Sequence, residues 1–113
     1  MESQRQEKIA RQIQKDLGEI FQRRSTEFNN AMITVTKVYV TKDLAIARIY
    51  VSLFATKDKK ATLQMIRENI SEIRYDLGNR VRHQLRKIPE LEVFEDDTLD
   101  YIEHIDELLD DDK

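Results

Sequence analysis

Residues 31–54 read AMITVTKVYVTKDLAIARIYVSLF, two segments rich in β-branched and aromatic side chains with a short polar turn between them. Such side chains favour β-strands, and the gap at Lys42–Asp43 is short enough for a hairpin. Within residues 45–54 every second position is apolar, which predicts one buried and one exposed face. The positions expected on the buried face are Ala47, Ile49, Val51 and Leu53.

The first segment of this hairpin, residues 31–41, changes phase in its middle. In a regular strand its apolar residues would fall on opposite faces, Ile33 and Val35 on one and Val38 and Val40 on the other. One extra residue in the strand returns all four to the same face. We therefore expect a β-bulge near Thr36–Lys37.

Helical periodicity flanks the hairpin on both sides. An apolar stripe with three- and four-residue spacing predicts a first helix that carries Ile9, Ile13, Leu17, Ile20 and Phe21. A second stripe comprises Leu63, Ile66, Ile70, Ile73, Leu77, Val81, Leu85 and Ile88. This stripe is longer than a usual globular helix, so we expect a kink or break at Ser71 or Gly78 and an end at Pro89.

The remaining C-terminal residues complete the expected element order. Residues 91–94 (LEVF) predict a short strand, and a final short helix is indicated by Leu99, Ile102, Ile105 and Leu108. The expected fold is α+β, in the order α-β-β-α-α-β, with helices on one face of a three-stranded sheet and a short C-terminal helix. We expect a single domain over residues 1–109 and a disordered acidic tail over residues 110–113.

The composition argues against several classes of protein. The chain has 113 residues and no cysteine, which excludes a disulfide framework and a thiolate metal site. No apolar run approaches the roughly 20 residues that a bilayer span requires. Because the first twelve residues are too polar for a secretion signal, we expect a cytoplasmic protein that does not associate with membranes.

Catalytic chemistry also finds little support. The two histidines, His83 and His104, stand among basic and acidic residues respectively, without a partner nucleophile. Two glycines are too few for a phosphate-binding loop, and the acidic run at residues 95–100 lacks the glycine and glutamate of a calcium loop. We expect no enzymatic activity, no cofactor and no bound metal.

The charges divide sharply along the chain. Residues 1–89 carry 18 Lys and Arg against 10 Asp and Glu, whereas residues 90–113 carry one Lys against 12 acidic residues. This asymmetry predicts a basic body that binds a polyanion and an acidic segment that moderates the binding.

Arginines dominate the second long helical stripe and suit contacts with phosphate groups. On this stretch, taken as helical up to Ile88, we expect Arg82 and Arg86 to project nearly opposite the apolar stripe. The residues expected to bind RNA are Arg74, Arg80, Arg82, Arg86 and Lys87 on this helix, with Lys37, Lys42 and Arg48 from the hairpin.

Three segments together resemble the ribosome-binding factor A family, whose fold is that of a type II KH domain. They are KIARQIQKDLGEIF (8–21), MITVTKVYVTKDLAIARIYVSLF (32–54) and EIRYDLGNRVRHQLRKIPELEVFEDDTLDY (72–101), and the resemblance covers residues 5–109. It implies a kink between two helices at Asn69-Ile70-Ser71, where Ser71 stands at the family's usual glycine.

The resemblance also implies a function. A member of this family binds the free 30S small ribosomal subunit and its 16S rRNA, assists late maturation and 5′-end processing, matters most at low temperature and has no catalytic activity. We accordingly expect a monomer with RNA partners and no DNA partner. The alternative from the residues alone is a protein–protein interaction module that uses amphipathic helices and the acidic tail.

Overall fold

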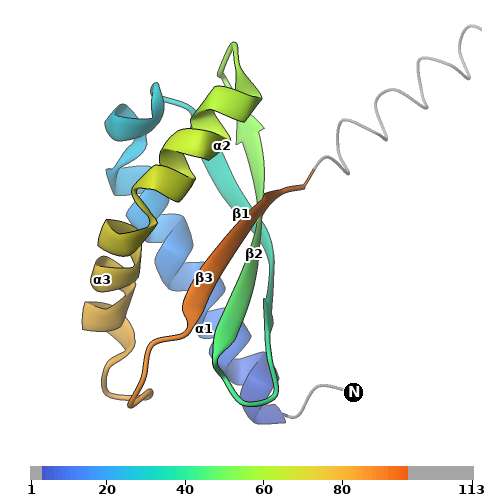
Figure 1. Ribbon diagram of the computed structural model, residues 1–113, viewed down its shortest axis with the longest axis vertical. Coiled ribbons are helices and arrows are strands. Elements are labelled where there is room, and N and C mark those ends of the chain that lie inside the picture. Colours follow the sequence, from blue (N-terminus) through green and yellow to red (C-terminus); the bar gives the residue numbers. More distant parts are fainter. Residues whose placement is uncertain (1–3, 97–113) are drawn as a thin grey trace, which may run out of the picture.

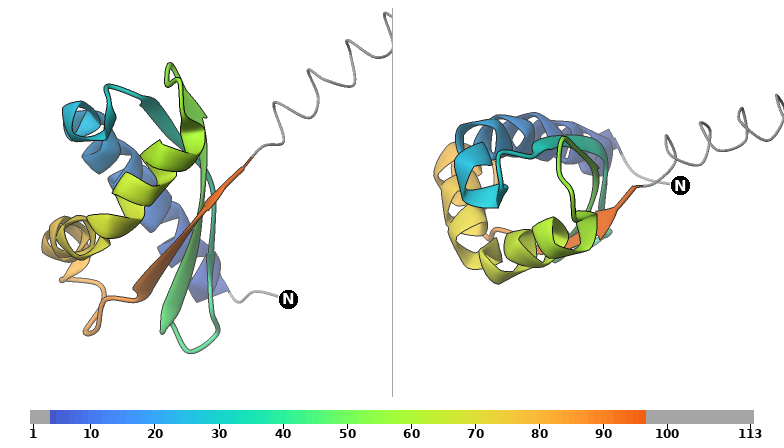
Figure 2. Two further views of the ribbon diagram at one scale, coloured as in Figure 1. Left: turned by 45° about the horizontal axis from the view of Figure 1, so that its top comes forward. Right: turned by 90° about the horizontal axis from the view of Figure 1, so that it is seen from above.

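The computed structural model describes residues 4–96, which form three helices packed on one face of a three-stranded sheet (Figures 1 and 2). The elements are α1 (Gln4–Arg23), the short 3-10 helix η1 (Ser25–Phe28), β1 (Met32–Val40), β2 (Ile46–Phe54), α2 (Lys59–Glu68), α3 (Ile70–Val81) and β3 (Glu90–Glu95). This confirms the expected α+β class and element order. The expected C-terminal helix and acidic tail lie outside the described residues.

The sheet has the order β1-β2-β3, with β1 antiparallel and β3 parallel to the central strand β2. The predicted bulge is present, because the register of β1 against β2 shifts between Val35 and Lys37. Val35 and Val38 are therefore both buried beneath the helices although their spacing is odd. The predicted buried face of β2 is also confirmed.

Helix α1 contributes the largest part of the helical core. Its predicted apolar stripe is buried throughout, from Ile9 to Phe21. Two groups of ion pairs join this region to α3: Arg24 contacts Asp76 at 2.8 Å and Glu72 at 3.3 Å, and Arg80 contacts Glu19. These pairs fix the side of α3 that faces α1.

The long apolar stripe forms two helices that meet at Asn69. The break falls within the segment that the family resemblance implies, whereas the expectation of a break at Gly78 is wrong, because α3 continues through it. The Asn69 side chain donates to the Met65 carbonyl at 2.8 Å. This side-chain amide thus satisfies a carbonyl at the end of α2, which favours a helix end at this residue.

The expected helix to Ile88 is also wrong, because α3 ends at Val81 and the chain turns back through residues 82–89. Strand β3 must start beside the beginning of β2, where the Glu90 N–H donates to the Ala45 carbonyl at 2.9 Å. Seven further helical residues would extend α3 by about 10 Å along its own axis and leave only Pro89 to connect it with β3. Leu85 fits the helical spacing of the stripe, but it belongs to the loop after α3, and its side chain packs into the core from there.

Candidate nucleic-acid interface

Three segments that are distant in sequence meet at one end of the molecule, the lower end in Figure 1. They are the first turn of α1, the turn between β1 and β2, and the loop between α3 and β3. The hollow between them has a volume of about 600 Å³. We call the cationic and imidazole side chains here the basic end, which comprises Arg5, Lys42, Arg82, His83, Arg86 and Lys87.

All side chains of the basic end are at least partly exposed, so their charges face solvent. Among the described residues that line the hollow, Asp43 carries the single carboxylate. Hydrogen bonds from the Thr41 hydroxyl and the Ala45 N–H hold the pKa of Asp43 below its ordinary value, and the charge of Lys87 adds a smaller effect in the same direction. Asp43 is therefore ionised at neutral pH and offsets one of the neighbouring positive charges.

Arg74, one of the predicted phosphate ligands, instead holds the loop that carries three others. Its Nε donates to the Pro89 carbonyl at 3.0 Å and its Nη2 to the Ile88 carbonyl at 2.6 Å. Two donors on one planar group fix both position and direction. Arg74 thus anchors the end of the loop directly after Arg86 and Lys87.

Arg80 faces α1 rather than the basic end. Its guanidinium contacts Glu19 and lies 3.6 Å from Asp16, and the hydrogen bond to Glu19 raises the pKa of Arg80 above its ordinary value. These carboxylates already neutralise its charge. Arg80 is therefore poorly placed for an additional phosphate.

The two predicted residues within the strands lie on the sheet face opposite the helices. Arg48 contacts Glu92 at 3.3 Å, and its guanidinium carbon lies 6.0 Å from the centroid of the Tyr39 ring. Lys37 is exposed at the bulge. The structure thus brings together Lys42, Arg82, Arg86 and Lys87 of the predicted set. Arg74 lies beside this group but donates to the loop backbone, whereas Arg80, Lys37 and Arg48 lie apart from it.

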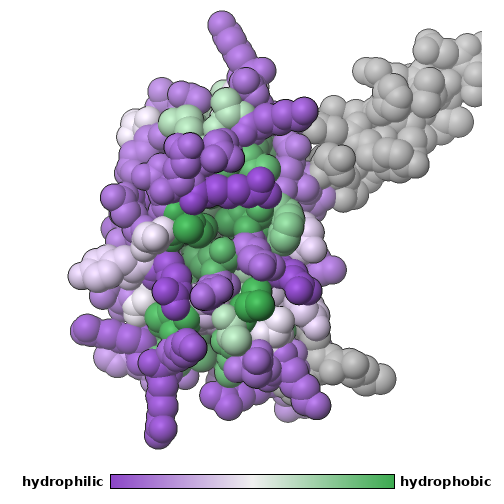
Figure 3. Space-filling view, in the orientation of Figure 1, coloured by the Kyte–Doolittle hydropathy of each residue, from purple (hydrophilic) through white to green (hydrophobic). Residues whose placement is uncertain are grey.

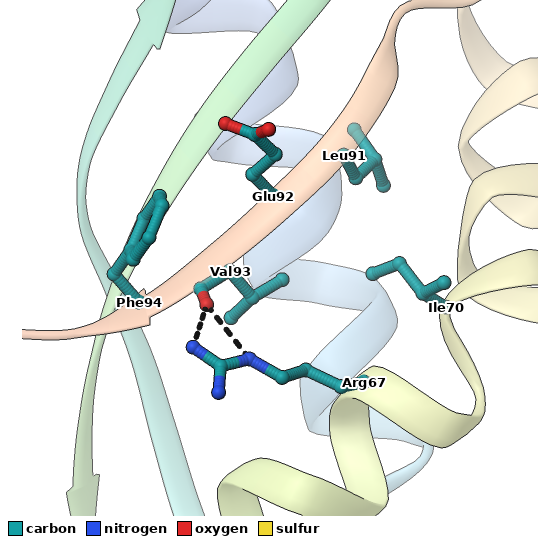
Figure 4. A pocket seen from close by; sticks show the side chains of 6 residues that line it. All are labelled: Arg67, Ile70, Leu91, Glu92, Val93 and Phe94. Atoms are coloured by element: carbon teal, nitrogen blue, oxygen red, sulfur yellow. Dashed lines mark hydrogen bonds between the residues drawn. The ribbon is translucent and has the colours of Figure 1, made fainter.

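A further pocket of about 340 Å³ lies between the junction of α2 with α3 and the edge strand β3 (Figure 4). Arg67 reaches across it, and its Nε and Nη2 donate to the Val93 carbonyl at 3.1 and 2.7 Å. The other lining side chains are mostly apolar, and Figure 3 shows hydrophobic surface between hydrophilic side chains over this region. Arg67 therefore stabilises the sheet edge here.

The sequence did not predict a role for Arg5, which lies in the first turn of α1 and belongs to the basic end. It also missed the outer side of α1, where Lys8, Arg11 and Lys15 are exposed and make no ion pair within residues 4–96. Their spacing of three and four residues could have predicted that they share one side of a helix. The proximity of Arg5 to residues 82–87 could not be predicted from the sequence, because it depends on the tertiary fold.

The described part of the chain contains no group of three or more His, Cys, Asp or Glu side chains arranged to hold a metal ion. Within the same residues, 4–96, no helix combines the length and the apolar character needed to cross a bilayer.

Comparison with known proteins identifies close relatives along nearly the whole chain. The family model for ribosome-binding factor A matches residues 5–109. Ribosome-binding factor A of Flavobacterium johnsoniae is 49% identical over 111 residues, a match that covers 96% of this chain and 85% of the relative.

Solved structures of the same family share the fold. The crystal structure of ribosome-binding factor A from Thermus thermophilus aligns with a TM-score of 0.68 at 22% identity, covering 80% of this chain and 94% of that one. A homology model of the Thermus thermophilus protein, fitted into the cryo-EM map of its complex with the 30S subunit, aligns with a TM-score of 0.63 at 26% identity. That match covers 76% of this chain and 89% of the other.

Proposed function

Since this chain belongs to the ribosome-binding factor A family, we propose that it binds the free small ribosomal subunit and that its basic end contacts phosphates of the 16S rRNA. One observation carries the proposal. Four Lys and Arg side chains and one imidazole line the hollow at a single end of the fold, against one carboxylate among the described residues lining it, and exposed Lys42 stands next to that carboxylate in the chain. Such a surface suits a polyanion, because each contacted phosphate releases condensed counterions.

The role that we propose is one of binding and positioning. The protein would assist late maturation of the subunit and processing of the 5′ end of 16S rRNA, with its greatest importance at low temperature and in the cytoplasm. A bound protein favours the RNA conformation that it fits, and this shift in population needs no catalytic group. A relative in complex with the 30S subunit supports this role.

Sedimentation with separated ribosomal subunits and intact ribosomes at two salt concentrations tests the proposal. We expect retention on free small subunits alone. With about six phosphate contacts, affinity should fall on the order of a thousandfold between roughly 50 and 200 mM salt. Binding that is insensitive to salt, or equal on all ribosomal particles, would contradict the proposal.

A matched pair of variants assigns the contact to the basic end. The triple substitution Arg82→Gln, Arg86→Gln, Lys87→Gln removes three positive charges there, and the slope of log affinity against log salt should fall in magnitude by about 2–3. The control Arg23→Gln, Lys57→Gln, Lys60→Gln removes three exposed charges from the end of α1 and the beginning of α2, segments that lie away from the basic end in Figure 1, and should leave the slope unchanged. Equal effects would show that overall charge, rather than this surface, determines affinity.

The same experiment separates RNA binding from a protein–protein module. For such a module, neutralising Asp110, Asp111 and Asp112 would abolish binding, whereas the triple substitution at the basic end would be tolerated. Our proposal requires the opposite result.

A further inference from the structure

A second hollow adjoins the basic end, on the side of the α3–β3 loop that faces α3. Its volume is about 680 Å³, within the range of roughly 300–1,000 Å³ that small-molecule sites occupy. One stripe of α3 forms a wall and the loop forms the other. The lining residues are Ser71, Arg74, Tyr75, Gly78, Asn79, Arg82, Leu85, Arg86, Lys87 and Ile88.

Tyr75 is the unusual residue in this wall. Its relative exposure is 71%, the highest among the large hydrophobic side chains of the described residues. Within residues 4–96 its hydroxyl makes no hydrogen bond and its ring stacks on no other ring. An aromatic ring held in solvent beside cationic side chains is a frequent feature of surfaces that stack nucleobases.

The opposite wall of the hollow is held in place before any ligand arrives. Arg74 donates to the carbonyls of Ile88 and Pro89, and Leu85 is buried in the core. Gly78 allows a close approach, because a Cβ atom there would lie 3.2 Å from the Ile88 Cγ1. A fixed loop keeps the ordering cost of binding low.

This hollow shares three cationic side chains with the basic end, because the α3–β3 loop separates the two hollows and contributes to both. Arg82, Arg86 and Lys87 line both hollows, and each is exposed. The hollow therefore offers an aromatic face within the same field of positive charge. The side chains of Ser71 and Asn79 add hydrogen-bonding groups to its wall.

We propose that this hollow binds an unpaired RNA nucleotide, whose base stacks on Tyr75 while Arg82, Arg86 and Lys87 contact the adjacent phosphates. This inference rests on the proposed function and adds the class of RNA that the site selects. In a duplex, neighbouring base pairs cover both faces of each base, so a side chain can stack only on a base that is splayed out. The site consequently favours a loop, a bulge or an unpaired end over a continuous helix.

Binding of a short single-stranded RNA that contains 2-aminopurine, compared with the same strand in a duplex, tests this inference. The substitution Tyr75→Leu keeps an apolar side chain but removes the aromatic face. We expect it to weaken single-strand binding about 5- to 150-fold and to abolish 2-aminopurine quenching, while duplex binding stays the same. The substitution Tyr75→Phe should restore both signals.

Tyr39→Leu serves as the matched control, since Tyr39 lies on the sheet face away from the hollow. It should leave both RNAs bound as before. Thermal unfolding of each variant checks the fold, and Tyr75→Leu should change the midpoint little because its ring is exposed.

The possible failures are distinguishable. If Tyr75→Leu changes nothing while the triple substitution at the basic end still weakens RNA binding, the nucleotide site is wrong and the proposed function stands. If the triple substitution also has no effect, the proposed function fails as well. If Tyr75→Leu weakens binding of an acidic peptide but not of RNA, the hollow is a protein-docking site and our inference is overturned.

Discussion

Gly18 and Gly78 both stand inside helices, yet their surroundings differ. A Cβ atom added at Gly18 would meet nothing within 4 Å, so the close packing that a glycine in a helix suggests is absent there. A Cβ atom at Gly78 would lie 3.2 Å from the Ile88 side chain. Sequence alone could not distinguish the two glycines, because the difference comes from a loop that returns to only one of them.

The same substitution should therefore have opposite effects at these positions. Gly18→Ala should stabilise the protein by about 1 kcal/mol, because alanine favours the helix and restricts the unfolded chain. Gly78→Ala should lower the unfolding midpoint, because Ile88 would have to move away from α3. Chemical denaturation of both variants measures the difference, and equal gains would contradict the close contact at Gly78.

Asp43 should respond to pH in a defined direction. Its pKa is lowered in the folded protein, chiefly by the Thr41 hydroxyl, so its stabilising contribution is complete above the ordinary value of 3.8 and is lost as pH falls through the lowered pKa. A carbon NMR titration of its carboxyl group should give a midpoint below 3.8. Thr41→Val should raise this midpoint more than Lys87→Gln does. A midpoint at or above 3.8 in the unmodified protein would refute the assignment.

Among the elements, α2, α3 and the loop after them show what periodicity can and cannot predict. The apolar spacing correctly identified Ile66, Ile73, Leu77, Val81 and Leu85 as buried. It could not show that the chain leaves the helix after Val81, because Leu85 also packs in the core from a loop. The break at Asn69 agreed with the family resemblance, and the Asn69 side chain donates a hydrogen bond to the Met65 carbonyl there, a contact that the apolar spacing does not encode.

Arg74 should act on RNA binding through the loop rather than by contact. Arg74→Lys keeps the positive charge but loses the pair of donors to the Ile88 and Pro89 carbonyls. We expect a loss of stability of about 1–3 kcal/mol and weaker RNA binding, although the net charge is unchanged. Denaturation and RNA titration measure the two effects. Unchanged stability would show that the loop does not need Arg74, and full affinity would show that its position is unimportant for RNA.

At the scale of the whole molecule, the fold was predictable and the site only partly so. The element order, the bulge and the buried faces followed from local patterns, and the family resemblance is confirmed by the family model. The grouping of cations required tertiary information. Arg80 pairs with Glu19, which is 61 positions away, while Arg5 joins residues 82–87. The sequence did not predict a role for Tyr75, because only the folded structure shows that its ring is exposed.

The charge asymmetry predicts that the acidic C-terminal residues moderate RNA binding. Substituting Asp110, Asp111 and Asp112 with Asn in the full chain should strengthen binding of non-specific RNA a few-fold at low salt, because fewer negative charges repel phosphate. The effect should vanish at high salt, where screening leaves only short-range interactions. Titrations at both salt concentrations measure it, and unchanged or weaker binding at low salt would reject the prediction.

The parallel pairing of β2 with β3 has a consequence for synthesis of the chain. A parallel neighbour requires a crossover connection, here through α2 and α3, so β3 can join the sheet only after both helices have been made. Arg5 emerges from the ribosome early, whereas Arg86 and Lys87 emerge just before this last strand. A nascent chain therefore cannot assemble the basic end, which needs both Arg5 and the loop that leads into β3, before β3 has been synthesised.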